Sequence, residues 1–241
     1  MNLPRILSIL LLVYVTYECI RLLFGWLLTR RLSKQTLPFF RESPELPYSF
    51  LLLGDSTVYG VGASDPTRSL AGKIAAAFPE HNILNRGIIA LSLGDLPTVI
   101  GTVSSGQTRK FDAVFILIGG IDILRLTPLS TIRKNLLSSI AAAKKLSPNI
   151  FLASSSNIRS APFFRFPADR CFERQHRAVE ELYARVSATE HITHIPLFTE
   201  FPHCPFARNH KKLYAQDGLH PNDAGYSVWF EKIYPFLKRE T

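Results

Sequence analysis

The stretch LLLGDSTVYGVG, from Leu51 to Gly62, joins three leucines directly to glycine, aspartate and serine. A short apolar run of this kind is typical of a strand that is buried on both faces. The polar residues then follow the carboxyl end of that strand, which is where open α/β sheets bind their ligands. Two interpretations result: Ser56 is a nucleophile presented at a strand end, or the stretch is an ordinary turn between a strand and a helix.

The same pattern continues along the chain. Apolar runs with strand character lie at 48–56, 82–88, 111–120, 149–156 and 191–197. Helical patterns follow them, at 68–78, 93–103, 129–145, 171–188 and 224–237. Near-continuous apolar strands that are separated by helices predict a parallel sheet covered on both faces. We therefore expect one three-layer α/β/α domain over residues 48–241.

The first thirty residues form a separate apolar segment. Residues 6–29 would make a helix of about 36 Å, enough to cross a hydrocarbon core of about 30 Å. Glu18 and Arg21 interrupt this segment three positions apart, where they can pair with each other or turn toward protein. A cleaved signal peptide and a helix lying in the membrane plane are the alternatives, but no small-x-small cleavage site follows. We predict an uncleaved membrane anchor over residues 1–32.

A polar, proline-containing linker is expected over residues 33–47. Basic residues after the apolar segment outnumber those before it, so the positive-inside rule places the domain in the cytoplasm. The net charge of +9 is spread along the chain without a basic block or a nucleic-acid module. A membrane surface is therefore the expected partner rather than nucleic acid. Three cysteines are too few for a disulfide framework, and the oligomeric state is not indicated.

A histidine and an aspartate near the C-terminus offer the groups that a serine nucleophile needs. His220 stands in AQDGLHPNDAGY, with Asp217 three residues earlier. A serine hydroxyl reacts when a neighbouring base takes its proton, and the base is usually a histidine oriented by a carboxylate. A D-x-x-H turn lets the carboxylate reach Nδ1 and leaves Nε2 free to face Ser56. The alternative interpretation is a capping loop with a solvated histidine.

Other polar and glycine residues follow the predicted strands, and the sheet would bring them to the same edge as Ser56. They are Gly87, the segment from Gly119 to Asp122, and Asn157. This convergence does not depend on any motif.

Four blocks appear in a fixed order: GDSTVYGVG, NRGIIA, GGID and DGLHPNDAGY. Over about residues 48–238 the chain resembles the SGNH (GDSL-type) hydrolase family. The resemblance implies a flavodoxin-like sandwich, with Ser56 as nucleophile, His220 as base and Asp217 as its orienting partner. It also implies that the amides of Ser56 and Gly87 hold the oxyanion, and that no metal or organic cofactor is required. Supporting residues at this edge would be Asp55, Gly119, Gly120, Asp122 and Asn157.

One block departs from the family pattern. The family has G-x-N-D, whose asparagine donates to the oxyanion, whereas this chain has Ile121 at that position. Loss of such a donor typically costs about 10²–10³ in rate. Either two backbone donors suffice, or another polar group such as Asn157 substitutes, or catalysis is weak or lost. As a carboxylate, Asp122 would repel the developing negative charge.

The expected reaction is cleavage of a carboxylic ester, acyl or acetyl, on a small-molecule or lipid-like substrate. A non-catalytic binding or scaffold protein with this fold is one alternative. An acyltransferase that acts on envelope glycans or lipids is another.

An aromatic segment follows the fourth predicted strand. Residues 159–172 carry Phe163, Phe164 and Phe166 between prolines, either as a lid over the core or as an apolar substrate wall facing the bilayer. Residues 197–206 would extend it. The nearby histidines and Cys204 match no standard zinc spacing, so no metal is expected.

Overall fold

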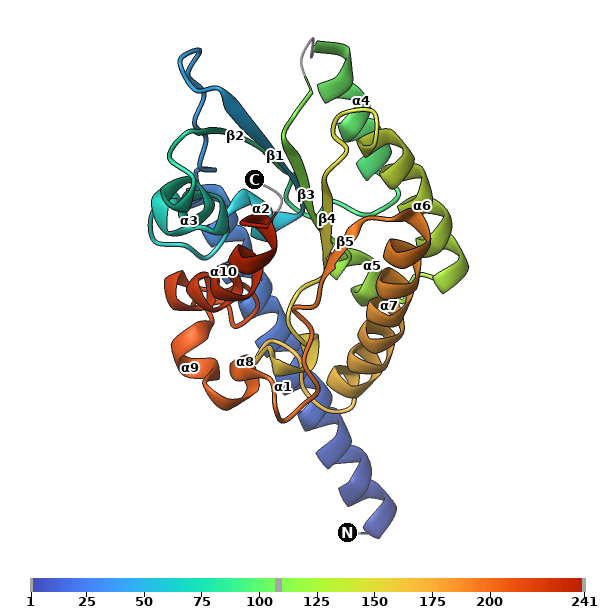
Figure 1. The fold of residues 1–241 in the computed structure, drawn as a ribbon. Coiled ribbons are helices and arrows are strands. Elements are labelled where there is room, and N and C mark those ends of the chain that lie inside the picture. Colours follow the sequence, from blue (N-terminus) through green and yellow to red (C-terminus); the bar gives the residue numbers. More distant parts are fainter. Residues whose placement is uncertain (1, 107–109, 240–241) are drawn as a thin grey trace.

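A computed structural model of the chain describes residues 2–106 and 110–239. The first residue of the predicted anchor and the last two of the predicted domain lie outside the described residues. Five strands form one parallel sheet in the order β2-β1-β3-β4-β5 (Figure 1). They are β1 (Tyr48–Gly54), β2 (His81–Gly87), β3 (Ala113–Leu117), β4 (Ile150–Ala153) and β5 (Thr193–Ile195). The predicted parallel sheet is confirmed, and its strand order is that of flavodoxin-like folds.

Helices cover both faces of the sheet, as a three-layer sandwich requires. On one face lie α3 (Leu70–Ala77) and α10 (Asp223–Leu237). On the other lie α4 (Leu96–Gly106), α6 (Leu129–Ala143) and α7 (Ala168–Glu190), as Figure 1 shows. The chain order reverses at β1, which lies between β2 and β3. A crevice for ligands forms at such a reversal.

The leucine run that opens this fold is buried from both sides. Leu51 and Leu53 pack in the cluster formed with α4, α6 and α7. Phe50 and Leu52 point to the opposite face and pack with α3 and α10. Because alternate side chains of a strand point to opposite faces, a strand buried on both sides needs an unbroken apolar run.

Some boundaries differ from the sequence prediction. The helix predicted over 93–103 begins at Leu96, with Pro97 in its first turn, where a missing amide proton costs no hydrogen bond. The strand predicted over 191–197 is shortened to three residues. Six short helical segments were not predicted, because a single turn is too short to show periodicity. They are α2 (Ser56–Tyr59), α5 (Gly120–Leu124), α8 (Pro205–Arg208), α9 (His210–Leu213), η1 (Pro66–Arg68) and η2 (Ile158–Ser160).

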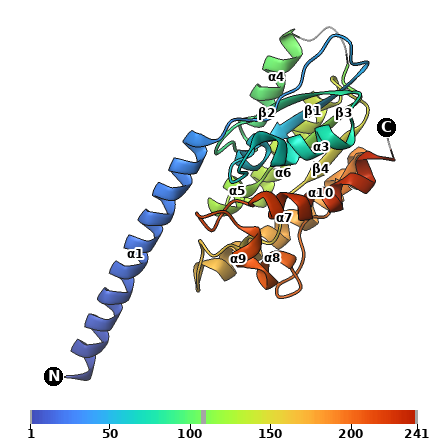
Figure 2. The same cartoon turned by 90° about the vertical axis from the view of Figure 1, so that its left-hand side faces the viewer.

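The N-terminal helix α1 (Leu3–Gln35) extends from the body of the molecule, with its N-terminus far from the sheet (Figure 2). It is the single helix in the described residues that is long and apolar enough to cross a membrane. The helix continues three residues past the predicted end of the anchor. Within the predicted linker, Arg41 pairs with Ile83 of β2 and its guanidinium donates to the carbonyl of His81 at 2.9 Å. The second half of that segment is therefore packed on the sheet.

Candidate active site

Ser56 lies directly after β1, at the carboxyl edge of the sheet. Gly54 is required before it, because a Cβ there would stand 2.0 Å from the carbonyl oxygen of Leu117. Asp55 caps α2, since its Oδ1 accepts the amide proton of Thr57 at 2.9 Å and also its hydroxyl at 2.7 Å. Ser56 is the first residue of α2, so its own amide has no partner within the helix.

Asp217 and His220 form a tight local turn. The Oδ1 of Asp217 accepts the backbone amides of Leu219 at 3.0 Å and of His220 at 3.1 Å. The Oδ2 lies 2.6 Å from Nδ1 of His220. Burial alone would raise the pKa of Asp217, but the hydrogen bonds from His220 and from the two amides hold that pKa below its ordinary value. The carboxylate therefore stays charged and faces the imidazole.

The structure brings this pair to the serine. Nε2 of His220 lies 2.8 Å from Oγ of Ser56, although 164 positions separate them in the sequence. With Nδ1–H donating to Asp217, Nε2 carries the lone pair that accepts the serine proton. His220 is only 5 % exposed, so water competes little for that contact. A hydroxyl, an imidazole and a carboxylate thus form one continuous chain of hydrogen bonds.

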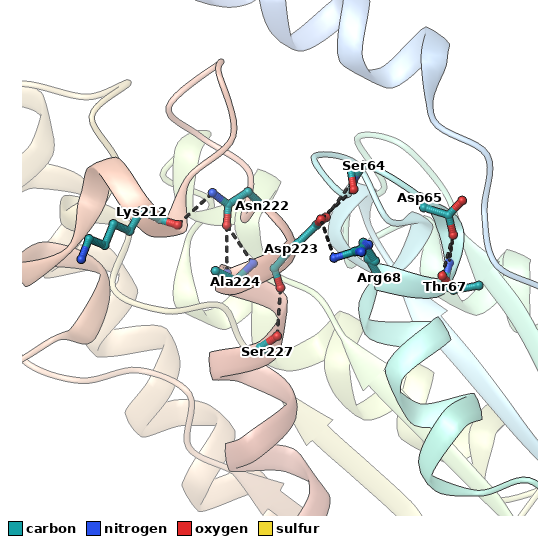
Figure 3. Close-up of polar contacts among 10 residues, drawn as sticks. Ser64, Asp65, Thr67, Arg68, Lys212, Asn222, Asp223, Ala224 and Ser227 are labelled. Atoms are coloured by element: carbon teal, nitrogen blue, oxygen red, sulfur yellow. Dashed lines mark hydrogen bonds and ion pairs between the residues drawn. The ribbon is translucent and has the colours of Figure 1, made fainter.

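A set of polar contacts ties the histidine loop to the loop that follows α2 (Figure 3). Asn222 caps α10 through its Oδ1, and its Nδ2 donates to the carbonyl oxygen of Lys212 at 2.9 Å. Asp223 accepts the amide of Ser64 at 2.8 Å and its hydroxyl at 2.6 Å. Arg68 lies 3.6 Å from the same carboxylate. Asn222 and Asp223 directly follow the His220 loop, so these contacts help to hold His220 close to Ser56.

A small cavity of about 100 Å³ opens beside Ser56 and His220. Its wall is mostly apolar and is formed by Ile121, Leu124, Ile158, Ala161, Phe206, Leu219 and Trp229. A cavity of this size holds a short apolar group, whereas drug-sized ligands occupy about 300 Å³ or more.

The third block of the sequence turns its isoleucine, not its aspartate, toward this cavity. Gly119 adopts a left-handed backbone (φ 116°) just before α5, and Ile121 lines the cavity. Asp122 is buried, and its Oδ2 accepts the amide of Leu93 at 2.9 Å. Burial raises the pKa of Asp122 and also that of Asp55. The Asp122 carboxylate is therefore hydrogen-bonded to the loop before α4 and does not line the cavity.

Gly87 does not have the free amide that the sequence analysis expected. Its N–H donates to Oδ1 of Asn85 at 2.9 Å. A Cβ on Gly87 would stand 2.3 Å from the amide nitrogen of Tyr59, so glycine is needed here for the close approach of α2 to β2. The role of Gly87 in this arrangement is packing. In the same loop, the amides of Ile89 and Ala90 donate to no acceptor in the described part of the chain, and Ala90 has a φ of 61°.

The side-chain amide of Asn157 is also hydrogen-bonded to residues outside the cavity. Its Nδ2 donates to Oε1 of Glu173 at 2.9 Å and to the carbonyl oxygen of Thr199 at 3.2 Å. Its Oδ1 accepts the amide of Arg159. Both amide protons are used, and the side chain does not line the cavity. The alternative in which Asn157 replaces the missing oxyanion donor is not supported by this geometry.

The aromatic segment is in part packed on the core, as its lid interpretation expects, and none of its three phenylalanines lines the cavity beside Ser56. Phe164 packs edge-on against Phe163 and Phe172 and lies against the core. Phe166 instead is 66 % exposed. Cys204 is buried in the core near α10. Among the described residues no group of three or more metal-binding side chains is assembled.

Sequence analysis missed one contact at this site. Thr29, at the C-terminal end of the apolar run in α1, donates its hydroxyl to Oδ2 of Asp217 at 3.1 Å. A threonine in an apolar run carries no signal of such a role.

Comparison with known families identifies this arrangement. A model of the GDSL-like lipase/acylhydrolase family matches residues 52–228, from within β1 into α10. The chain belongs to the GDSL-like lipase/acylhydrolase family. Membership places the protein among hydrolases that act on esters. No curated protein matches the sequence significantly.

Solved structures of esterases and lipolytic proteins share the fold. A lipolytic protein of the G-D-S-L family from Veillonella parvula DSM 2008 is 18 % identical with a TM-score of 0.64, over 80 % of this chain and 99 % of that one. TesA is 18 % identical with a TM-score of 0.62, over 80 % and 99 %. A catalytic mutant of Axe2, an acetylxylan esterase from Geobacillus stearothermophilus, is 19 % identical with a TM-score of 0.59, over 78 % and 93 %.

Proposed function

We propose that this protein is a serine esterase that cleaves carboxylic esters through an acyl-enzyme intermediate. The 2.8 Å contact between Ser56 Oγ and His220 Nε2 is the observation that carries the proposal. As Ser56 Oγ attacks the acyl carbon, His220 accepts its proton, and the same nitrogen then returns the proton to the leaving alcohol. Asp217 holds the imidazole in the required tautomer and stabilises the imidazolium.

The oxyanion needs donors aimed at the reacting carbonyl. The Ser56 amide is one such donor, because it stands at the first position of α2 without a helical partner. We assign the second donor to the loop that follows β2, where the amides of Ile89 and Ala90 are available, whereas that of Gly87 is bound to Asn85.

The substrate side of the proposal follows from the cavity and from α1. The cavity of about 100 Å³ suits a short acyl group. The apolar helix α1 and the exposed Phe166 support a site that lies beside a membrane surface. A short acyl ester of a small or lipid-like molecule near the membrane fits both features.

Substitution of the nucleophile tests the proposal. In the full-length chain, Ser56→Ala should reduce hydrolysis of p-nitrophenyl acetate to the background rate and abolish labelling by a fluorophosphonate. The matched control Ser130→Ala, on the exposed face of α6, should keep both properties. Wild-type rates in a folded Ser56→Ala variant would remove the nucleophile assignment. A wild-type chain that neither hydrolyses the ester nor takes the label would favour the non-catalytic alternative.

A further inference from the structure

The N-terminal helix reaches the catalytic loop directly. Thr29 donates its hydroxyl to Oδ2 of Asp217 at 3.1 Å, which is the same oxygen that faces Nδ1 of His220 at 2.6 Å. The other carboxylate oxygen already accepts the amides of Leu219 and His220. An ionised carboxylate has about four acceptor sites, so Thr29 supplies the last donor that Asp217 can use.

We propose that Thr29 is a positioning residue for the catalytic histidine, so that the apolar helix α1 is part of the active site. This inference rests on the proposed esterase function. Thr29 is uncharged and lies on an element that the family match does not include, since that match begins at residue 52. Its hydroxyl orients the carboxylate, and the carboxylate in turn orients the imidazole.

A second set of contacts holds α1 in the register that this bond needs. Arg21 donates to the carbonyl oxygen of Phe163 at 2.8 Å and pairs with Glu18 at 2.7 Å. At Gly25 the helix approaches so closely that a Cβ would stand 2.8 Å from the Phe163 ring. The amide of Phe163 donates to the carbonyl oxygen of Gly218, the neighbour of Asp217, at 3.0 Å. The contacts therefore run without a break from α1 to the catalytic loop.

The spacing of these residues explains why one helix can make all the contacts. Arg21, Gly25 and Thr29 are four positions apart, so they lie on a single face of α1. A charged pair inside an apolar helix is costly in lipid and is expected to face protein. Docking of Arg21 on the Phe163 loop satisfies that requirement. The same face then places Thr29, two turns later, against Asp217.

Substitution of Thr29 in the full-length chain, kept in one detergent, tests the proposal. Thr29→Val should lower kcat/KM for p-nitrophenyl acetate roughly threefold to tenfold, as expected for one lost hydrogen bond. The acid limb of its pH profile should move to higher pH, because the carboxylate without this donor stabilises the imidazolium more strongly. Thr29→Ser keeps the hydroxyl and should restore both values. Thr16→Val, on the exposed side of the same helix, is the control and should match the wild type.

The other ionisable groups around Asp217 and His220 are the same in all the Thr29 variants. Asp55, in the turn after β1, is the second carboxylate that interacts with His220. Tyr226 of α10 interacts with Asp217. Arg21 and Arg165 line the crevice beside Asp217. A shift of the pH profile in Thr29→Val alone is therefore assigned to the lost hydroxyl.

A double-mutant cycle tests the role of the Arg21 contact. Arg21→Met should lower kcat/KM, because α1 loses its hold on the Phe163 loop. The double variant with Thr29→Val should have a kcat/KM only slightly lower than that of the more impaired single variant. Both substitutions interrupt the same chain of contacts from α1 to Asp217. Fully additive losses would contradict a shared path.

One readout does not depend on turnover. The downfield NMR signal of the His220 Nδ1 proton reports its bond to Asp217, and it should shift in Thr29→Val and return in Thr29→Ser. Wild-type kcat/KM, pH profile and proton signal in Thr29→Val would overturn the positioning role. An inactive wild-type chain with a shifted signal in Thr29→Val would overturn the esterase proposal and leave this contact supported.

Discussion

At the scale of single residues, Ile121 stands where a side-chain donor to the oxyanion would be expected. It lines the cavity beside Ser56 and His220, at the position where the resembled pattern has an asparagine. Its branched apolar side chain offers no donor, and Asn157 does not replace it. Under the proposed function, backbone amides would then stabilise the developing charge without a side-chain donor from this position.

Restoration of a side-chain donor should therefore speed the reaction. We predict that Ile121→Asn raises kcat for p-nitrophenyl acetate roughly tenfold or more, because a well-placed oxyanion donor is worth about 10²–10³ in rate. Ile121→Leu changes the shape but adds no donor, and it should give no gain. A folded Ile121→Asn variant with unchanged or lower kcat would show that another group already completes the site.

At the scale of elements, a buried polar cluster joins the end of β4 to α7. His176 and Glu180 stand one turn apart on α7, and both contact the hydroxyl of Ser154. Nδ1 of His176 accepts the amide of Ile158 at 3.3 Å, which fixes the other ring nitrogen as the donor. Burial lowers the pKa of His176 to about 4, against the smaller opposing effects of Glu180 and Glu173. The cluster is therefore built around a neutral imidazole.

This arrangement makes the fold sensitive to acid. The neutral imidazole stabilises the folded state above the ordinary histidine pKa of about 6.5, and that stability is lost as the pH falls toward 4. Lowering the pKa of His176 by this much corresponds to a change in folding free energy on the order of 3 kcal/mol. The difference in free energy of unfolding between wild type and His176→Gln should therefore narrow from pH 7 to pH 4 in urea titrations. A difference that is constant over this range would contradict a neutral buried His176.

The elements also show what the sequence could predict. Local patterns sufficed for the strand at Leu51–Leu53 and for the turn that joins Asp217 to His220, because each depends on neighbours in the sequence. The amide of Gly87 was misjudged because Asn85, two residues earlier, folds back onto it. Asn157 was one of the alternatives for the missing donor, and its long-range partner Glu173 on α7 could not be foreseen from the sequence. Sequence pattern identifies which residues reach the edge of the sheet, but contacts made in the folded chain, local for Gly87 and long-range for Asn157, decide which of them stay free.

At the scale of the whole molecule, the boundary between anchor and domain is less sharp than composition suggests. The bond from Thr29 to Asp217 joins residues 188 positions apart. Tyr14 also donates its hydroxyl to the carbonyl oxygen of Phe166, at 3.2 Å. Apolar composition predicts that α1 is a membrane segment, yet one of its faces contacts the loops that hold Phe163 and Asp217. Within residues 1–32 the Glu18–Arg21 pair predicts a contact with protein, but the sequence does not indicate Asp217 as a partner.

These contacts favour an anchor over a cleaved signal peptide. Removal of the apolar segment would take Arg21 and Thr29 away from the Phe163 loop and from Asp217, so we predict that the mature protein keeps residues 1–35. The intact mass of protein purified from membranes should equal that of the full chain, and washing with alkaline carbonate should not release it. A shorter mass, with activity in the soluble fraction, would contradict the prediction. It would also mean that Asp217 works without the Thr29 hydroxyl, so the intact mass and the Thr29→Val variant test the same contact independently.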